Sequence, residues 1–506
     1  MVLSRIVLIT GAAAGIGLAT AHAFARGGDT VVLSDIDGAA AERAAEALGP
    51  AHQGLALDIS DERAIVSVIA RVAHRFGRID VLVNNAGIVD PEARPALDVP
   101  LDAVQRLIDV NLTGTWLAAR EAGRVMLLQG EGSIVNIASG AALAALPGRA
   151  AYGMTKAAVL GFTRALACEW AGRGVRVNAV LPGYVETEIL ASLRRQGRFD
   201  PAVVERAIPL GRLGHPAEIA AVIRHVAGAT YMAGASIIVD GGVDAFGGSG
   251  RASSARAPSA TAGGAMIVTG GASGIGAAVA DRAAATGESV VVFDRDAAAI
   301  AALPGNRVGI VVDVTDGAML ARATAAVEER YGRINTLVNS AGVADIGAPS
   351  LDQQRAGFEH VLSTNLSGAL VTARAVAPGM AATGGGSIVN LASIAAVAGL
   401  PGRNGYCAAQ AGLSFLTKAL ACEWAMHGIR VNAVAPGYIQ TPAMIPHRRD
   451  ADIIRRRVPI GRLGTPTEIA DTVMFLASSE ASYVTGATWL SDGGITAHGG
   501  AEPASP

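Results

Sequence analysis

Two stretches of this chain share one pattern: Leu8-Ile9-Thr10-Gly11-Ala12-Ala13-Ala14-Gly15-Ile16-Gly17 and Ile267-Val268-Thr269-Gly270-Gly271-Ala272-Ser273-Gly274-Ile275-Gly276. Each begins as an apolar strand, continues as a Thr-Gly-x3-Gly-x-Gly loop and leads into an Ala-rich helical stretch. Such a loop lets the backbone approach a pyrophosphate, whose charge then faces the N-terminus of the helix. One match alone is compatible with an ordinary glycine-rich turn, but its repetition favours two dinucleotide cradles.

The rest of the chain repeats in the same order, which indicates a duplicated domain and not a solenoid, whose repeats are far shorter. Residues 111–187 align without gaps on residues 365–441. Shorter matches are Asn84-Asn85-Ala86-Gly87 with Asn339-Ser340-Ala341-Gly342, Gly211-Arg212-Leu213-Gly214 with Gly461-Arg462-Leu463-Gly464, and Asp240-Gly241-Gly242 with Asp492-Gly493-Gly494.

The predicted fold is α/β: two tandem Rossmann-type domains, each with a doubly wound parallel sheet. Apolar runs without polar alternation, such as residues 31–35 and 290–294, are typical of buried parallel strands. Helical stretches such as 62–76 lie between them. We expect one domain at 1–245 and a second at 265–498. Residues 246–264 are small and polar and predict a flexible linker, and 499–506 a tail.

Composition excludes several classes of protein. The 506 residues are 51% hydrophobic and 17% charged, which indicates more than one folded unit and excludes disorder over most of the chain. The net charge of -2 gives no electrostatic reason to expect nucleic acid or a membrane surface as partner. Three cysteines and a first strand too short for a signal peptide predict a cytoplasmic protein. The histidines show no metal-ligand spacing, so no metal site is expected.

An acidic residue ends the second strand of each repeat, Asp35 in the first and Asp294 in the second. Such a carboxylate accepts hydrogen bonds from an adenosine ribose and repels a 2′-phosphate, so NAD is favoured over NADP. Arg295 weakens this preference in the second repeat. Asp58 and Asp313 end the following strand, where they either reach the adenine or cap the next helix.

Tyr152 and Lys156 lie one helical turn apart, Ser139 precedes them just after an apolar strand, and Asn111 lies further upstream. Pro182-Gly183 follows the next strand. In order and spacing these motifs resemble the short-chain dehydrogenase/reductase family, in its subfamily of about 250-residue domains. The resemblance covers nearly all of both repeats.

The resemblance implies roles for these residues. Tyr152 transfers the proton, Ser139 bonds the substrate oxygen, Lys156 bonds the nicotinamide ribose and Asn111 holds a relay water. A Lys⁺ at roughly 4–5 Å favours the phenolate by about 3–4 kcal/mol before desolvation, so we expect Lys156 to lower the pKa of Tyr152. The cofactor-binding residues expected in the first repeat are Thr10, Gly11, Gly15, Ile16, Gly17, Asp35, Asp58, Asn85, Ala86, Gly87, Lys156, Pro182, Gly183 and Thr187.

The second repeat departs from the family pattern. Asn365, Ser393 and Tyr406 stand at matching positions, but Gln410 replaces the lysine, and Lys418 is too far along the helix to substitute for it. We expect this repeat to bind NAD more weakly and to be inactive, unless Gln410 serves a different chemistry. Its expected cofactor residues are Gly270, Gly274, Ile275, Gly276, Asp294, Asp313, Asn339, Ala341, Gly342, Pro436, Gly437 and Thr441.

The sequence therefore predicts an NAD(H)-dependent oxidoreductase that interconverts a secondary alcohol and a ketone. Two alternatives remain: an NADPH-dependent 3-oxoacyl-thioester reductase, or an NAD-binding pseudoenzyme that senses redox state. The substrate is a small molecule, and arginines in 188–208 and 442–458 are either solvated or face an anionic one. From the family, we expect the halves to pair through helices at 114–128 and 152–172, and two chains to form a four-domain homodimer.

Overall fold

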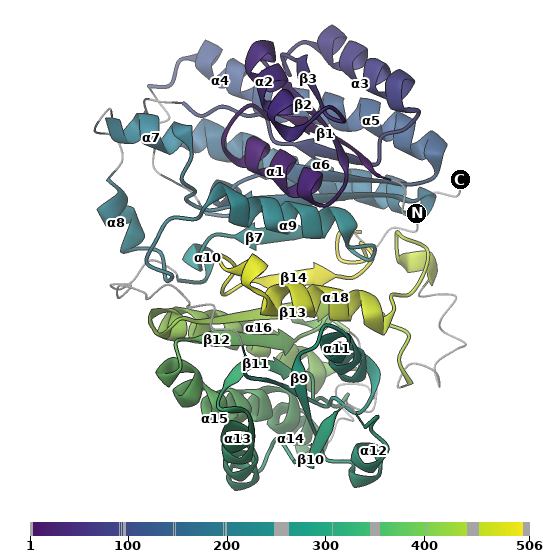
Figure 1. Ribbon diagram of the computed structural model, residues 1–506, viewed down its shortest axis with the longest axis vertical. Coiled ribbons are helices and arrows are strands. Elements are labelled where there is room, and N and C mark those ends of the chain that lie inside the picture. The colour runs from purple at the N-terminus through teal and green to yellow at the C-terminus, as the bar shows by residue number, and fades with distance from the viewer. Residues whose placement is uncertain are drawn as a thin grey trace.

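The computed structural model describes residues 4–246 and 263–498, apart from 91, 93, 95–97, 145, 147, 196, 198–199, 306, 345–354, 401 and 443–454. Most of the predicted linker, the tail and parts of both arginine-rich loops therefore lie outside the described residues. Each half of the chain forms its own seven-stranded sheet, and the two halves are stacked along the long axis of the molecule (Figure 1).

The strands of the first sheet are β1 (Ile6–Thr10), β2 (Thr30–Asp35), β3 (Gln53–Ala56), β4 (Val81–Asn84), β5 (Gly132–Ile137), β6 (Val175–Pro182) and β7 (Ser236–Val239). The helices around it are α1 (Gly15–Arg26), α2 (Gly38–Leu48), α3 (Glu62–Phe76), α4 (Leu101–Ile108), α5 (Thr115–Gln129), α6 (Ala150–Trp170), α7 (Glu188–Arg195), α8 (Pro201–Glu205), α9 (Pro216–Gly228) and α10 (Val243–Phe246).

The strands of the second sheet are β8 (Ala265–Thr269), β9 (Ser289–Asp294), β10 (Val308–Val311), β11 (Ile334–Asn339), β12 (Gly386–Leu391), β13 (Ile429–Pro436) and β14 (Thr488–Ser491). Its helices are α11 (Gly274–Ala285), α12 (Ala297–Ala301), α13 (Gly317–Tyr331), α14 (Arg355–Leu362), α15 (Gly368–Ala382), α16 (Asn404–Trp424) and α18 (Pro466–Ala477).

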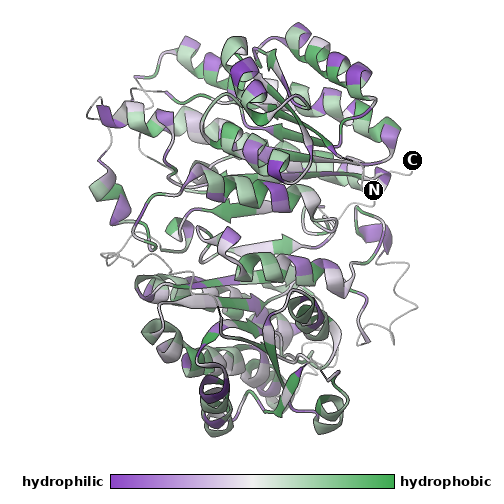
Figure 2. Ribbon diagram, viewed as in Figure 1, coloured by the Kyte–Doolittle hydropathy of each residue, from purple (hydrophilic) through white to green (hydrophobic). Residues whose placement is uncertain are grey.

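The strand order is β3-β2-β1-β4-β5-β6-β7 in the first sheet and β10-β9-β8-β11-β12-β13-β14 in the second, with every pairing parallel. This is the predicted fold. The central strands are buried from both faces, whereas the edge strands β3 and β10 are partly exposed. Figure 2 shows hydrophobic residues along the central strands. The strand order reverses between β1 and β4, where a doubly wound sheet opens a crevice at the carboxyl ends of its strands.

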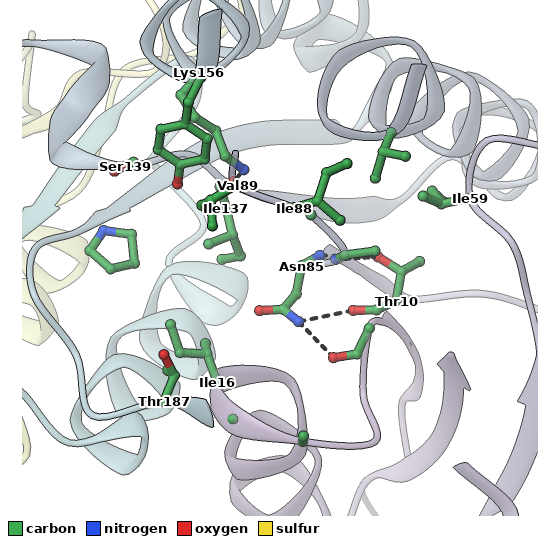
Figure 3. A pocket seen from close by; sticks show the side chains of 18 of the residues that line it. Thr10, Ile16, Ile59, Asn85, Ile88, Val89, Ile137, Ser139, Lys156 and Thr187 are labelled. Carbon is green, nitrogen blue, oxygen red and sulfur yellow. Dashed lines mark hydrogen bonds between the residues drawn. The ribbon is translucent and has the colours of Figure 1, made fainter. Parts of the chain in front are cut away.

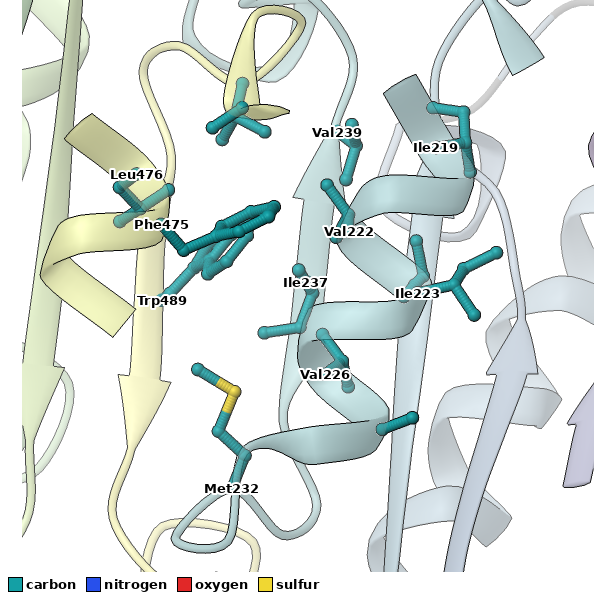
Figure 4. Close-up of a cluster of buried hydrophobic side chains, with 14 of the residues drawn as sticks. Ile219, Val222, Ile223, Val226, Met232, Ile237, Val239, Phe475, Leu476 and Trp489 are labelled. Atoms are coloured by element: carbon teal, nitrogen blue, oxygen red, sulfur yellow. The ribbon is translucent and has the colours of Figure 1, made fainter. Parts of the chain in front are cut away.

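The halves pack against each other, but through different elements from those expected. The sheet edges β7 and β14 meet there, flanked by α9 and α18 (Figure 1), and one hydrophobic cluster runs through both halves. At its centre the Phe475 ring stacks on His225 with centroids 4.2 Å apart, and Trp489 Nε1 donates to the Ile238 carbonyl at 3.4 Å. Figure 4 shows Phe475 and Trp489 on one side of this cluster and Ile237 and Val226 on the other. Leu128 on α5 stays 90% exposed. The prediction that the halves pair through α5 and α6 is wrong, because the described halves bury a shared hydrophobic cluster at β7 and β14 instead.

Among the described helices, none combines the length and the apolar character needed to cross a membrane.

Candidate active site

A pocket of about 620 Å³ opens at the switch point of the first sheet. Figure 3 shows residues from the ends of several strands around it, with Lys156 and Ser139 on one side and Thr10 and Asn85 on another. Most of the predicted residues line it: Thr10, Gly11, Gly15, Ile16, Asp35, Asp58, Asn85, Ala86, Gly87, Ser139, Tyr152, Lys156, Pro182, Gly183 and Thr187. Asn111 and Gly17 lie behind this lining.

The glycine loop joins β1 to α1 in the conformation that the motif requires. Gly15 has φ of +55°, a left-handed backbone that favours glycine. A Cβ at Gly17 would lie 2.1 Å from the Gly11 carbonyl oxygen, so only glycine lets the loop fold onto the helix. Ala14, the residue before α1, gives the helix no side-chain cap. The first N–H groups of α1 therefore face the pocket with their positive partial charge, as a phosphate site requires.

Thr10 and Asn85 line the pocket, and the structure shows them holding the loop in place. The Thr10 hydroxyl accepts from the backbone N–H groups of Asn85 and Ala86, both at 3.1 Å. The Asn85 amide donates to the Thr10 and Gly11 carbonyls at 3.1 and 2.8 Å. Sequence reasoning assigned both to the cofactor and missed this supporting role.

The Asp35 carboxylate is fixed at the end of β2 beside the glycine loop. It accepts from the Ala13 N–H at 3.0 Å and the Asp37 N–H at 3.2 Å. Asp294 repeats this arrangement in the second half, with Ala272 N–H at 3.2 Å. Both carboxylates thus lie at the end of the second strand of their sheet, beside the glycine loop.

Asp58 and Asp313 do not cap helices, so that alternative is wrong. Asp61 and Asp316 cap α3 and α13. The Asp58 carboxylate instead accepts from the Ser60 hydroxyl at 2.7 Å and the Ser60 N–H at 2.9 Å, which lowers its pKa. Both aspartates line their pockets.

Tyr152 and Lys156 project from α6 toward Ser139, which follows β5. Lys156 is only 5% exposed; its Nζ donates to the Ile137 carbonyl at 2.8 Å and lies 5.9 Å from the Tyr152 ring centroid. The Ser139 oxygen accepts from the Ala141 N–H at 3.2 Å, which holds the hydroxyl at the mouth of the pocket. A phenol, a hydroxyl and an ammonium group thus converge within a few ångströms of one another.

Burial dominates the electrostatics of this group. Although the Tyr152 side chain is partly exposed to the pocket, desolvation of the phenolate raises its pKa, and the Ser139 hydroxyl and the Arg149 charge lower it by less. Burial also lowers the pKa of Lys156 from 10.5 to about 8. The attraction expected from Lys156 was worked out before desolvation; in the structure desolvation is the larger effect on the pKa of Tyr152.

Asn111 is fully buried in the π-helix η1 (Asp109–Gly114) between α4 and α5. Its amide makes a reciprocal pair with the Ile88 backbone, accepting from N–H and donating to C=O, both at 2.8 Å. Asn111 therefore fixes the strand-end segment that carries Gly87 and Ile88 into the pocket. The relay water expected at Asn111 stays a prediction.

The second half has an equivalent pocket of about 480 Å³. Its lining contains Gly270, Gly274, Ile275, Asp294, Asp313, Asn339, Ala341, Gly342, Asn365, Tyr406, Gln410 and Thr441, whereas Gly276, Ser393, Pro436 and Gly437 lie outside it. Gln410 is 4% exposed, and its buried amide oxygen has no hydrogen-bond partner among the described residues. Lys418 forms an ion pair with Asp244 of the first half at 2.8 Å and does not replace the missing lysine.

The chain is similar to several known proteins. A family model described as enoyl-(acyl carrier protein) reductase matches residues 11–244 and 270–496. An uncharacterized short-chain type dehydrogenase/reductase, y4vI, from Sinorhizobium fredii is 38% identical over 512 residues, covering 97% of this chain and 92% of its own length. The chain belongs to the short-chain dehydrogenase/reductase family. D-threitol dehydrogenase from Mycolicibacterium smegmatis is 40% identical over 243 residues, covering 47% of this chain and 92% of that protein. A solved short-chain type dehydrogenase/reductase from Mycobacterium marinum is 35% identical, covers 48% of this chain and 96% of its own, and has a TM-score of 0.45.

This short-chain dehydrogenase/reductase is thus an oxidoreductase with two tandem domains, and the family implies a nicotinamide cofactor. The residues present fit such a group in both halves: an uncapped helix start, a strand-end carboxylate and, in the second half, an unpartnered amide oxygen.

Sequence reasoning missed part of the lining of the first pocket: Ala14, Ile36, Leu57, Ile59, Ile88, Val89, Arg106, Tyr184, Val185, Glu188 and Leu190. The signal for Tyr184 and Val185 was their position directly after Pro182-Gly183 at the end of β6. Arg106 comes from α4, and no local motif marks it.

Proposed function

We propose that the first half interconverts a secondary alcohol and a ketone with NAD(H), using Tyr152 as general acid and base. The observation that carries this proposal is the convergence of Tyr152, Ser139 and Lys156 beside a glycine cradle in one pocket. A bound nicotinamide would accept hydride from the carbinol carbon or return it. The remaining steps belong to side chains of this chain.

In the oxidation direction Ser139 donates a hydrogen bond to the substrate oxygen and Tyr152 takes the hydroxyl proton as the C–H hydride leaves. In reduction the neutral phenol donates its proton to the oxygen that becomes the alcohol. The raised pKa of Tyr152 suits donation. We expect the Lys156 ammonium, 5.9 Å from the Tyr152 ring centroid, to attract the phenolate that remains. Because the pKa of Lys156 is about 8, most of this charge is present at pH 7.

NAD is the proposed cofactor, and what supports it is the Asp35 carboxylate at the end of β2 beside the glycine loop, where a carboxylate can bind an adenosine ribose. A 2′-phosphate there would meet like charge. A solved structural neighbour is described as ElxO with NADP bound and is 31% identical. The relative named 3-oxoacyl-[acyl-carrier-protein] reductase, from Synechocystis, makes an acyl-thioester substrate with NADPH the rival assignment.

Small alcohols form the proposed substrate class. Among the relatives are proteins named D-threitol dehydrogenase, 2-(R)-hydroxypropyl-CoM dehydrogenase and galactitol 2-dehydrogenase, each about 40% identical over half of this chain. A panel of polyols, hydroxyacyl thioesters and cyclic secondary alcohols, followed by NADH absorbance, tests the assignment. Turnover with NAD⁺ that is lost in Tyr152→Phe supports it. A large preference for NADP⁺ would contradict the role given to Asp35, and no turnover of any alcohol would favour an NAD-sensing protein.

The same proposal gives the second half a cofactor site without catalysis, because Gln410 brings no charge to Tyr406.

We also propose that the protein is cytoplasmic, in keeping with its three free cysteines. Two chains are proposed to associate through the exposed faces that include Leu128 on α5. Light scattering tests this association, and a monomer of about 51 kDa would reject it.

A further inference from the structure

A tyrosine of the second half contacts the active-site loop of the first. Tyr483 lies between the short helix η9 (Ser479–Ala481) and β14, and it is fully buried. Its hydroxyl donates to the Tyr184 carbonyl at 3.0 Å. Tyr184 directly follows Pro182-Gly183 and lines the first pocket. The contact therefore links the half without the catalytic lysine to the backbone of the candidate active site.

The position of the Tyr483 ring is fixed from several sides. A Cβ at Gly214 would lie 2.4 Å from the ring and one at Gly241 2.8 Å from it, so both glycines leave the space that the ring fills. The Arg212 guanidinium lies 5.3 Å from the ring centroid. The Gly241 N–H also donates to the Tyr483 carbonyl at 3.1 Å. A ring held in this way presents its hydroxyl in one direction.

The Tyr184 carbonyl receives one donor from each half. Gly214 N–H donates to it at 2.9 Å from within the first half, and Glu186 N–H donates back to the Gly214 carbonyl at 2.8 Å. After these hydrogen bonds the chain continues to Thr187. The Thr187 methyl group lies close to Gly15: a Cβ built on Gly15 would be 3.6 Å from it. The loop thus runs from the interface directly over the glycine cradle.

We propose that Tyr483 is a positioning residue for the first active site. It holds the segment from Tyr184 to Leu190 in the conformation that closes the pocket over the glycine loop. This inference rests on the proposed function, and it gives the second half a role that does not need a catalytic lysine.

The pseudo-twofold arrangement supplies a matched control. Tyr231 of the first half donates to the Tyr438 carbonyl of the second at 3.1 Å, beneath the Arg462 guanidinium at 5.5 Å. Tyr231 is buried to the same extent as Tyr483. Tyr231→Phe and Tyr483→Phe therefore remove the same hydrogen bond from the same interface, but only Tyr483→Phe releases the loop of the first pocket.

The kinetic test compares the two variants in the full chain. Tyr483→Phe should raise KM for NAD⁺ and for the alcohol roughly three- to tenfold, the effect of one neutral hydrogen bond. The pH profile of kcat should stay unchanged because Tyr152 and Lys156 are untouched. Tyr231→Phe should leave both KM values within about twofold of those of the parent. The Tm of Tyr231→Phe should fall by as much as the Tm of Tyr483→Phe. Equal KM values in the two variants would overturn the proposal.

Hydrogen exchange followed by mass spectrometry separates this inference from the proposed function. Tyr483→Phe should speed exchange of the amides of 183–190, and Tyr231→Phe should speed exchange of those of 437–442. If the parent protein turns over no alcohol, the proposed function fails, and the exchange result still decides the role of Tyr483. Unchanged exchange at 183–190 in Tyr483→Phe would overturn the positioning role even in an active enzyme.

Discussion

Lys156→Gln should make the protein more stable at neutral pH while removing its activity. Lys156 is buried, and burial lowers the pKa of its ammonium group from 10.5 to about 8. The second half carries Gln410 at the same position of the equivalent helix, buried to the same extent. The chain therefore shows that the fold accepts glutamine there.

The size of the effect follows from the pKa shift. Holding the ammonium charged in the folded protein costs about 1.4 kcal/mol per pKa unit, or about 3 kcal/mol for Lys156 at pH 7. Glutamine avoids that cost but buries an amide oxygen, which in Gln410 has no partner and costs about 1–3 kcal/mol. The expected net gain in the free energy of unfolding is therefore between about 0 and 2 kcal/mol at pH 7.

The gain depends on pH with a definite sign. Below about pH 8 both the folded and the unfolded chain hold the Lys156 proton, so the advantage of the variant is constant. Between about pH 8 and 10.5 the folded chain has released this proton and the unfolded chain still binds it. The parent therefore gains about 1.4 kcal/mol per pH unit relative to the variant, whose advantage is gone by about pH 10.

Urea denaturation followed by circular dichroism at pH 7, 8, 9 and 10 measures this difference. Gln410→Lys serves as the reciprocal variant and should destabilise the protein at pH 7, with the opposite pH dependence. The burial argument would be refuted if Lys156→Gln were less stable than the parent at pH 7. It would also be refuted if the difference in free energy of unfolding between variant and parent did not change between pH 7 and 10.

Four other predictions concern catalysis, binding and the interface. Tyr152→Phe should lower kcat at least about 100-fold and Tyr406→Phe less than about twofold; equal losses would contradict a silent second half. Asp35→Ser should shift the ratio of kcat/KM for NADP⁺ over NAD⁺ upward by about tenfold, and an unchanged ratio would remove Asp35 from cofactor selection. Calorimetric titration should find two NAD sites per chain, the second about 10- to 100-fold weaker and tightened by Gln410→Lys; a single site would contradict the second cradle. Trp489→Ala should lower the free energy of unfolding by about 3–5 kcal/mol in urea titrations, and a loss below about 1 kcal/mol would mean that the interface is not central to stability.

Much of the fold and of the candidate site could be predicted from sequence because those features depend on local pattern. The residue pattern of 62–76 predicts a helix, and α3 (Glu62–Phe76) has those bounds. The glycine loop forms between a strand and a helix because its glycines are required by backbone geometry within a few residues. Tyr152 and Lys156 share one face of α6 through helix periodicity alone.

Other features depend on groups distant in sequence and were decided only by the tertiary structure. The side-chain amide of Asn111 pairs with the Ile88 backbone, a contact between residues 23 apart in the chain. The sequence predicts the attraction of Lys156 for the Tyr152 phenolate but not the desolvation by surrounding protein, which raises the pKa of Tyr152. Neither the partner of a buried amide nor the extent of desolvation follows from spacing along the chain.

The sequence by itself determined two doubly wound domains, and it predicts a nucleotide cradle in each and one complete catalytic set, because these follow from backbone geometry and short-range periodicity. The tertiary structure decided how the halves join, through β7 and β14, and placed Tyr483 against the loop that begins at Tyr184. An interface depends on which apolar surfaces are complementary in three dimensions. His225 faces Phe475 and Trp489 there, a match that no periodicity within either half encodes.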